Sequence, residues 1–556
     1  EFDPDVLKRY VNFMNNPDER TAVDQFGKGD KYFGVCVLMA TLPGMPMFGH
    51  GQIEGFTERY GMEFRRAMRD EGPDSWLVGR HEREISPLLH RRALFAEVHN
   101  FLLYDFYTDE GWVNEDVFAY SNRLGDDRAL VVYHNRYATA RGWIKMSCAY
   151  AEKGLHGKHL RQRSLSESFG VHDDADAFVM YRDAISGLEY MHRASDLVHK
   201  GLRIELEAYK YRVLLDWREV RDPARPWHAL CNILGGQGTP SLEQRLCELE
   251  LQPVHDAIAT ILEPATAEEL AGTISGEVEE APVATEKVTD EVLTRVRGGM
   301  HRLLDEMPRF IASGVGKSAG LEHVPATHED RESIVDSALL RLRTAKQLPE
   351  LEHYFSRSWS TEARAVLPSY EGNGNGAAIW DTVLALCTLE ALGNYYDPKD
   401  PEHAGARLFE AMKLREPIAA SLQRLGVEGE ERWRAVARVR AALAHASWAP
   451  GAEPVIGKTT APLSWLHDPD VAWLIGVHEW EGVRYFVKED YAKLLWWMAL
   501  PALLTIAGAP RPDVDAIREL ENDIESRLRA AEESGYRVEA LIDATTGHHE
   551  PKLIED

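Results

Sequence analysis

Short apolar runs and turn residues alternate at the start of the chain. Residues 9–15 form a half-apolar run that stops at Asn-Pro-Asp, which predicts a strand ending in a loop. Residues 31–41 are continuously apolar and end at Leu-Pro-Gly, which predicts a buried helix. A second strand over 45–48 and an amphipathic helix over 85–106 complete the order expected of a parallel α/β unit.

From about residue 108 the apolar pattern changes to short runs separated by turn residues. Six strands are predicted, at residues 116–120, 129–134, 142–146, 177–181, 202–206 and 211–217. We expect an antiparallel all-β domain, in the form of a β-sandwich, with a helical insertion around 184–200.

Helical patterns dominate after the Gly-rich residues 235–240. An acidic stretch over 264–289 predicts an exposed linker, and a charged helix is expected over 513–534. The longest apolar run, 494–509, is too short to span a bilayer and contains Pro501, so it predicts a buried helix broken by proline. A Trp-rich patch lies over 465–497, where Trp473 and Trp480 are expected in the core.

Charge and cysteine content narrow the class of protein. A formal net charge of -27 on 556 residues repels phosphate backbones, so no nucleic-acid partner is expected, and no membrane span is predicted. The five cysteines form no C-x-x-C pair, which indicates buried free thiols in place of disulfides or zinc. The opening residues, Glu-Phe-Asp-Pro, lack a signal-peptide pattern, and a cytoplasmic location is favoured.

Two glycine-rich stretches and the histidines carry little chemistry. Gly316-Lys-Ser lacks the earlier glycine and the preceding strand of a phosphate-binding loop, and the glycines of 372–376 precede a helical run without a strand before them. The 22 histidines form no H-E-x-x-H pair, so no metal site is predicted.

Asn15-Asn-Pro-Asp-Glu19 has two interpretations. Asn16 as N-cap, Pro17 at the first helical position and Glu19 at the third satisfy a helix start without any function. Alternatively, Asp18 is a carboxylate at the C-terminal end of a parallel strand, where α/β barrels place their chemistry.

Phe13-Met-Asn-Asn-Pro-Asp18 resembles the last conserved region of the α-amylase superfamily, glycoside hydrolase family 13, on the seventh strand of its TIM barrel. Residues 42–55, Leu-Pro-Gly-Met-Pro-Met-Phe-Gly-His-Gly-Gln-Ile-Glu-Gly, resemble that family's eighth strand and loop. The resemblance implies that Asp18 is the transition-state-stabilising aspartate and that Asn16 and Pro17 contact substrate. Pro17 departs from the pattern by replacing a sugar-binding histidine, as in some maltosyl-transferring members.

The resemblance also implies a multidomain protein that is α/β, then all-β, then all-α. The expected segments are the last two strand-helix units of a TIM barrel (1–107), an amylase-type β-sandwich (108–235), a helical segment with acidic linker (236–289) and a helical domain (290–556). The family's nucleophile and acid/base lie on earlier strands, and no matching Arg-x-Asp or Glu strand is found here. We therefore expect a chain that lacks six barrel strands, is inactive alone, and whose first 107 residues are poorly packed or aggregation-prone in isolation.

Three functions are consistent with these residues. The first is an α-amylase-type hydrolase that acts on α-glucans or maltooligosaccharides by retaining double displacement. The second is a transglycosylase or maltosyltransferase with the same site, and the third is a non-catalytic protein that binds a glucan or a protein partner. No cofactor is expected apart from the calcium that the complete family fold can hold, and no oligomeric state is predicted.

Overall fold

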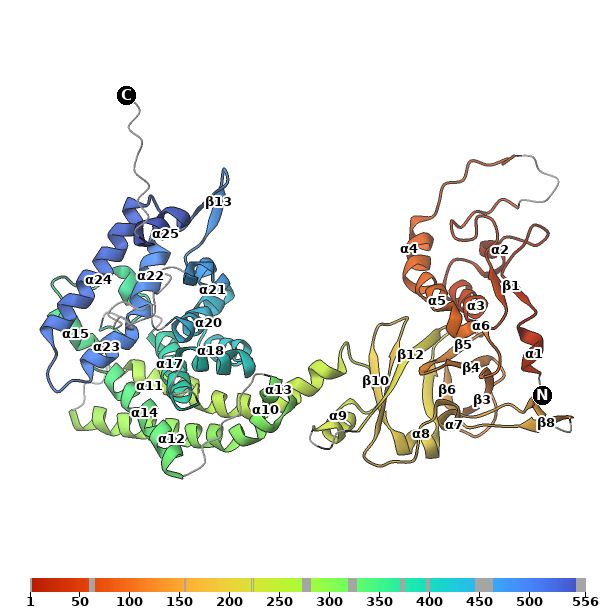
Figure 1. The fold of residues 1–556 in the computed structure, drawn as a ribbon, viewed down its shortest axis with the longest axis horizontal. Helices are drawn as coiled ribbons and strands as arrows, with labels where there is room; N and C mark the ends of the chain where they lie inside the picture. The colour runs from red at the N-terminus through yellow and green to blue at the C-terminus, as the bar shows by residue number, and fades with distance from the viewer. Residues whose placement is uncertain are drawn as a thin grey trace. The chain divides into compact units, whose positions relative to one another are not determined.

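The protein divides into two compact units, Glu1–Leu246 and Cys247–Asp556, which are described separately (Figure 1). The computed structural model describes residues 3–59, 66–154, 157–221, 223, 225–272, 282–318, 328–370, 376–396, 401–445 and 464–546. The glycines of 372–375 and the end of the chain lie outside these residues. All five cysteines are free, and only Cys36 and Cys387 are fully buried.

The first unit begins with a strand-helix-strand motif, as predicted. Its elements are α1 (Pro4–Leu7), β1 (Val11–Phe13), α2 (Ala22–Phe26), α3 (Asp30–Thr41) and β2 (Met45–Met47). β1 and β2 pair in parallel, with Val11 opposite Met45 and Phe13 opposite Met47. α3 forms the crossover between them and is buried along most of its length, because its sequence is apolar nearly all round.

The single helix predicted over 85–106 is wrong. The structure has α4 (Ser75–Glu84), α5 (Ser86–His90) and α6 (Arg92–Ala96), followed by β3 (Leu102–Thr108). Pro87 stands in the first turn of α5, where its missing N–H is tolerated, whereas a continuous helix would lose a hydrogen bond there. Along β3 buried and half-buried residues alternate, which is the period of a strand, so the sheet begins before the predicted boundary at 107.

One eight-stranded sheet follows, in place of the two facing sheets of a sandwich. The remaining strands are β4 (Val117–Leu124), β5 (Asp127–His134), β6 (Ala140–Ser147), β9 (Phe178–Asp183), β10 (Glu189–Arg193), β11 (Leu202–Leu206) and β12 (Tyr211–Val220). Their order is β10-β9-β12-β5-β4-β3-β6-β11, and every neighbouring pair is antiparallel. All six predicted strands are present. One core cluster takes residues from each of the eight strands, including both edge strands, so the curl of a single sheet encloses the core.

Smaller elements complete the first unit. They are the hairpin of β7 (Tyr150–Gly154) and β8 (Gly157–Arg161), then α7 (Leu165–Phe169), α8 (Ala194–Lys200) and α9 (Trp227–Leu234). The helical insertion predicted over 184–200 is correct only for α8, because β10 occupies the residues before it.

A second core joins the opening motif to the other face of the sheet. Tyr32, Phe33 and Val37 of α3 pack with Tyr133 of β5 and Val213 of β12. The opening segment is therefore well packed on this side, and its expected poor packing or aggregation in isolation stays a prediction. The outer residues of its two strands are different, since Val11, Phe13 and Met45 are 43%, 44% and 57% exposed.

The second unit is helical, as predicted for 290–556. α10 (Leu242–Ile261) begins in the first unit and continues into the second. The described helices that follow it are α11 (Pro264–Gly272), α12 (Pro282–Ala312), α13 (Gly314–Ser318), α14 (His328–Ala345), α15 (Leu348–Leu351), η1 (Glu352–Tyr354), α16 (Thr361–Arg364), α17 (Gly376–Tyr396), α18 (Pro401–Ala411), α19 (Arg415–Arg424), α20 (Gly429–Ala444), η3 (Ser464–His467), α21 (Pro469–Leu474), α22 (Lys488–Met498), α23 (Leu500–Ala507), α24 (Val514–Glu533) and α25 (Val538–Thr546). A hairpin of β13 (His478–Trp480) and β14 (Val483–Tyr485) interrupts them.

α17 is central to this unit. It packs against α11, α14, α18 and α20 and carries fourteen buried residues. Among the described helices it alone is long and apolar enough to cross a membrane, and 72% of its most apolar window is buried, as in a core helix.

Two further predictions fail in this unit and two hold. The exposed linker over 264–289 is wrong where the structure describes it, because Thr266, Ala267 and Leu270 of α11 are buried. Trp480 is 66% and Trp473 37% exposed, so neither belongs to the core. The helix break near Pro501 and the charged helix over 513–534 are confirmed as α22–α23 and α24.

Candidate functional site

The two motif loops leave the same edge of the β1–β2 pair. Because the strands are parallel, the residues after Phe13 and those after Met47 both start at carboxyl ends. Ligands of parallel α/β folds bind at that edge. The candidate site therefore consists of residues 14–19 and 48–59.

Asn16 shapes the first loop. Its side-chain Oδ1 accepts hydrogen bonds of 2.9 Å from the backbone N–H groups of both Asp18 and Glu19. This is a turn, and the next helix begins only at Ala22, so the predicted helix start at Pro17 is wrong. Pro17 and Asp18 are exposed, and the catalytic and binding roles of the three residues remain predictions.

Three contacts bring the two loops together. The buried Asn15 lies so close to Gly49 that a Cβ there would overlap its amide, which requires glycine. Gln52 accepts a hydrogen bond from Gly49 N–H at 3.0 Å, and its amide contacts the sulfur of Met14 at 3.3 Å. Arg59 donates to the backbone carbonyl of Asp18. The turn that carries Asp18 is thus held against the second loop.

Tyr32 and His81 form a buried polar pair that contacts the second loop through Gln52. The Tyr32 hydroxyl donates to the Gln52 carbonyl at 2.7 Å and lies 2.9 Å from His81 Nε2, an arrangement that favours the tautomer with its proton on Nε2. Burial lowers the pKa of His81 to about 4 and raises the pKa of Tyr32 well above its usual range. Both groups therefore stay neutral at pH 7 and act as fixed supports.

One exposed carboxylate in a fixed turn has limited chemistry. Asp18 can accept hydrogen bonds from hydroxyl groups, but double displacement at a glycosidic bond needs two carboxylates about 5 Å apart. Within the described residues no three His, Cys, Asp or Glu side chains gather to hold a metal ion. The calcium expected from the family resemblance remains a prediction.

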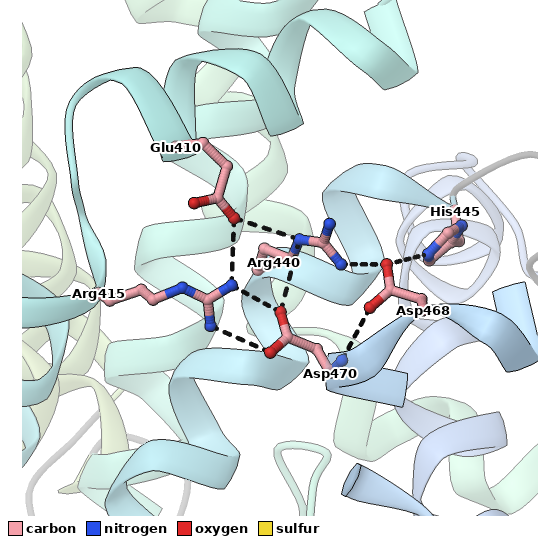
Figure 2. Close-up of polar contacts among 6 residues, drawn as sticks. All are labelled: Glu410, Arg415, Arg440, His445, Asp468 and Asp470. Carbon is pink, nitrogen blue, oxygen red and sulfur yellow. Dashed lines mark hydrogen bonds and ion pairs between the residues drawn. The ribbon is translucent and has the colours of Figure 1, made fainter. Parts of the chain in front are cut away.

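A charged cluster in the second unit was not predicted (Figure 2). It consists of Glu410, Arg415, Arg440, His445, Asp468 and Asp470. Asp468 caps α21 and receives hydrogen bonds from Arg440 and His445, which hold its pKa well below its ordinary value although burial acts in the opposite direction. Every member pairs with another member, so the cluster joins α18, α19, α20 and α21 and has a structural role.

Sequence reasoning missed the supporting residues of the first site. His81 was set aside because it lacks a second histidine for metal binding, and its contact with Tyr32 spans 49 positions. Asn15 and Gln52 lie inside the quoted motifs, yet only the fold shows that they face each other's loops. A Gly-x-Gly-Gln sequence after an apolar strand is the signal that could have indicated them.

No protein-family model matches the chain, and neither does any curated protein. Partial likenesses are found among solved structures. The α-amylase of Geobacillus thermoleovorans complexed with acarbose is 11% identical, with a TM-score of 0.24 over 37% of this chain and 38% of that one. An α-amylase of Anoxybacillus is 12% identical, with a TM-score of 0.22 over 36% and 37%. A variant of AmyP in complex with maltotriose gives 11% and 0.23 over 36% and 40%, so the chain spans well under half of each structure.

Proposed function

We propose that the chain is part of an α-amylase-type glycoside hydrolase that acts on α-glucans by retaining double displacement. The observation that carries the proposal is the parallel pairing of β1 and β2 across α3, which sends both motif loops from one edge. Barrel enzymes bind substrate at this edge, on the loops that follow the strands. Asp18 lies in the first of these loops, and Arg59 of the second loop donates to its backbone carbonyl.

Asp18 holds the sugar and does not form the covalent bond. An exposed carboxylate accepts hydrogen bonds from sugar hydroxyls, and these strengthen as the ring distorts toward the transition state. The covalent and proton-transfer steps belong to two further carboxylates on neighbouring parallel strands. The exposure of Val11, Phe13 and Met45 supports this, because apolar strand residues are normally covered by further strands or helices.

Transfer to a sugar acceptor is the second candidate, and Pro17 favours it. This exposed residue stands where the family's hydrolases carry a histidine that hydrogen-bonds the sugar. A proline ring offers only apolar contact at that position, so one polar contact with the donor sugar is lost. The same site can then pass the glycosyl group to a second sugar in place of water.

The test is an assay of maltooligosaccharide conversion by the chain alone and by the chain joined to its upstream reading frame. We expect products only from the longer protein, with glucose chains both shortened and lengthened if transfer operates. A longer protein that carries an Asp and Glu pair on its fourth and fifth strands, and that leaves maltoheptaose unchanged, would refute the enzymatic proposal and favour a binding role.

A further inference from the structure

A cavity of about 550 Å³ lies in the second unit between three elements that are far apart in sequence. Its walls are the 355–360 loop with the start of α16, one face of α22, and one face of α24 with the adjoining Tyr536. This volume falls within the range of sites that hold small molecules in proteins. None of these residues belongs to the candidate site of the first unit.

Three aromatic rings form the floor of the cavity. Phe355 lies 5.9 Å from Trp359 and 5.9 Å from Trp496, and the two Trp rings lie 6.2 Å apart, measured between ring centroids. All three side chains are at least nine-tenths buried, which fixes their positions. Tyr491 and Tyr536 add two more rings to the lining. The three rings are inclined to one another by 46° to 83°, so they present ring edges, and only a small apolar surface, to the cavity.

The wall formed by α24 is polar. Glu521, Glu525 and Glu532 recur at helical spacing with Leu528 between them, so they lie on one face of the helix, and that face lines the cavity. A surface helix normally turns such an apolar and acidic mixture toward solvent or pairs it fully. Here the carboxylates stand opposite the aromatic floor.

The wall is held in place before any ligand arrives. Glu521 accepts hydrogen bonds from the backbone N–H and the hydroxyl of Ser356, at 3.2 and 2.5 Å. Glu525 forms an ion pair of 3.7 Å with Arg357. The hydrogen bonds of Glu521 tie the 355–360 loop to α24, whereas the ion pair of Glu525 is solvent-exposed and contributes little. A carboxylate fixed in the way that Glu521 is fixed loses little conformational entropy when a ligand enters.

We propose that this cavity binds a neutral oligosaccharide. Carboxylates and cationic groups share its rim, as Glu362, Glu489, Glu521, Glu525 and Glu532 against Arg357, Lys488 and Arg529. The cations disfavour a positively charged ligand and the carboxylates disfavour an anion, whereas sugar hydroxyls both donate and accept hydrogen bonds. The apolar C–H groups of the pyranose rings then contact the accessible edges of the three aromatic rings.

This site is additional to the proposed active site and does not require the first unit to be a glycosidase. If both exist, the second unit holds a polysaccharide near the enzyme and raises its local concentration. The two proposals can therefore fail independently.

The test is isothermal titration of the full chain with maltotriose and with cellotriose. We expect saturable binding of at least one trisaccharide. Glu525→Gln and Arg529→Ala alter the rim without touching the aromatic core, and each is expected to weaken binding about tenfold. Glu519→Gln is the matched control, because Glu519 is exposed on the same helix and does not line the cavity. Asp18→Ala reports on the first unit.

Binding that is weakened by the rim variants and unchanged in Glu519→Gln and Asp18→Ala supports the cavity. Binding that Asp18→Ala abolishes and the rim variants leave intact places the sugar in the first unit, which overturns this inference and leaves the proposed function standing. Absence of saturable binding by both trisaccharides, or binding of choline in their place, also overturns it.

Discussion

Asp381 gives the second unit a pH-dependent stability that one substitution removes. The residue lies in the second turn of α17 with no exposed surface. Its Oδ1 accepts a hydrogen bond of 2.8 Å from the Ser421 hydroxyl, and its Oδ2 has no partner among the described residues. Burial raises the pKa of Asp381 from 3.8 to about 7, against the smaller opposing effect of the Ser421 hydrogen bond.

The sign follows from the two pKa values of Asp381. Below pH 4 the carboxyl is protonated in both the folded and the unfolded protein, so its ionisation does not change the free energy of unfolding. As the pH rises from 4 to 7 the unfolded chain releases the proton while the folded protein retains it, so stability falls, and above about pH 7 the loss stays constant at about 4 kcal/mol.

Asp381→Asn removes this titration. The amide also places an N–H group where Oδ2 has no partner, but that cost of about 1–3 kcal/mol does not depend on pH. The substitution should therefore be more favourable at pH 8 than at pH 5 by about 2.5 kcal/mol. Asp256→Asn, at an exposed carboxylate of α10, is the matched control for replacing a carboxylate by an amide.

Urea unfolding followed by far-UV circular dichroism at pH 5, 6, 7 and 8 measures the effect, because the second unit contributes most of the helical signal. The difference between the urea midpoints of the variant and of wild type should shift by about 1 M in favour of the variant between pH 5 and pH 8. A stability difference that stays within about 0.5 kcal/mol across this range would refute the reasoning.

Three further predictions concern stability. His81→Gln should reduce the loss of stability of the first unit at acid pH. In wild type the unfolded state binds a proton at His81 and the folded state does not, which lowers the free energy of unfolding by about 3 kcal/mol between pH 7 and pH 4. An unchanged dependence of the urea midpoint on pH would contradict this. Gly34→Ala should lower the free energy of unfolding by about 1–3 kcal/mol, because the added Cβ would overlap the buried ring of Tyr133. Gly79→Ala on α4 should be neutral or stabilising in thermal melts. Equal shifts in melting temperature would argue against close packing of α3 on the sheet. Asp468→Ala should cost about 1–3 kcal/mol, because it removes the acceptor that the partly buried Arg440 and His445 share. Asp515→Ala at an exposed ion pair should cost under about 1 kcal/mol. Equal losses in urea unfolding would show that the cluster does not stabilise the unit.

The local pattern of apolar and polar residues predicts an element correctly where a single periodicity extends along the whole element. β1, α3 and β2 were predicted because a half-apolar run, a continuous apolar run and a proline-glycine stop each have one common structural outcome. The pattern misled at 85–106, where short helices and a strand share apolar positions that also fit one long helix. It misled again at 264–272, where α11 contacts α17 more than a hundred positions away and thereby buries residues that look like linker.

The site shows the same division between local and long-range information. Asp18 and the glycine loop could be found because they are contiguous motifs after predicted strands. The contacts of Asn15 with Gly49 and of Tyr32 with His81 join separate segments, so no spacing rule indicates them. The cavity of the second unit is assembled from the 355–360 loop, α22 and α24. The Trp-rich patch and the charged helix were visible in the sequence, but nothing in either pattern indicates that they meet the 355–360 loop.

The carboxylate of Asp18 is the centre of the proposed function, and its most direct test is kcat/KM for maltooligosaccharide conversion by the longer protein. Asp18→Asn keeps the turn, because Asn16 bonds only the backbone N–H of this residue. We predict a fall of at least about a hundredfold in kcat/KM for Asp18→Asn with unchanged thermal stability, and little effect of Glu19→Gln in the same exposed turn. Equal rates for the two variants would contradict the role of Asp18.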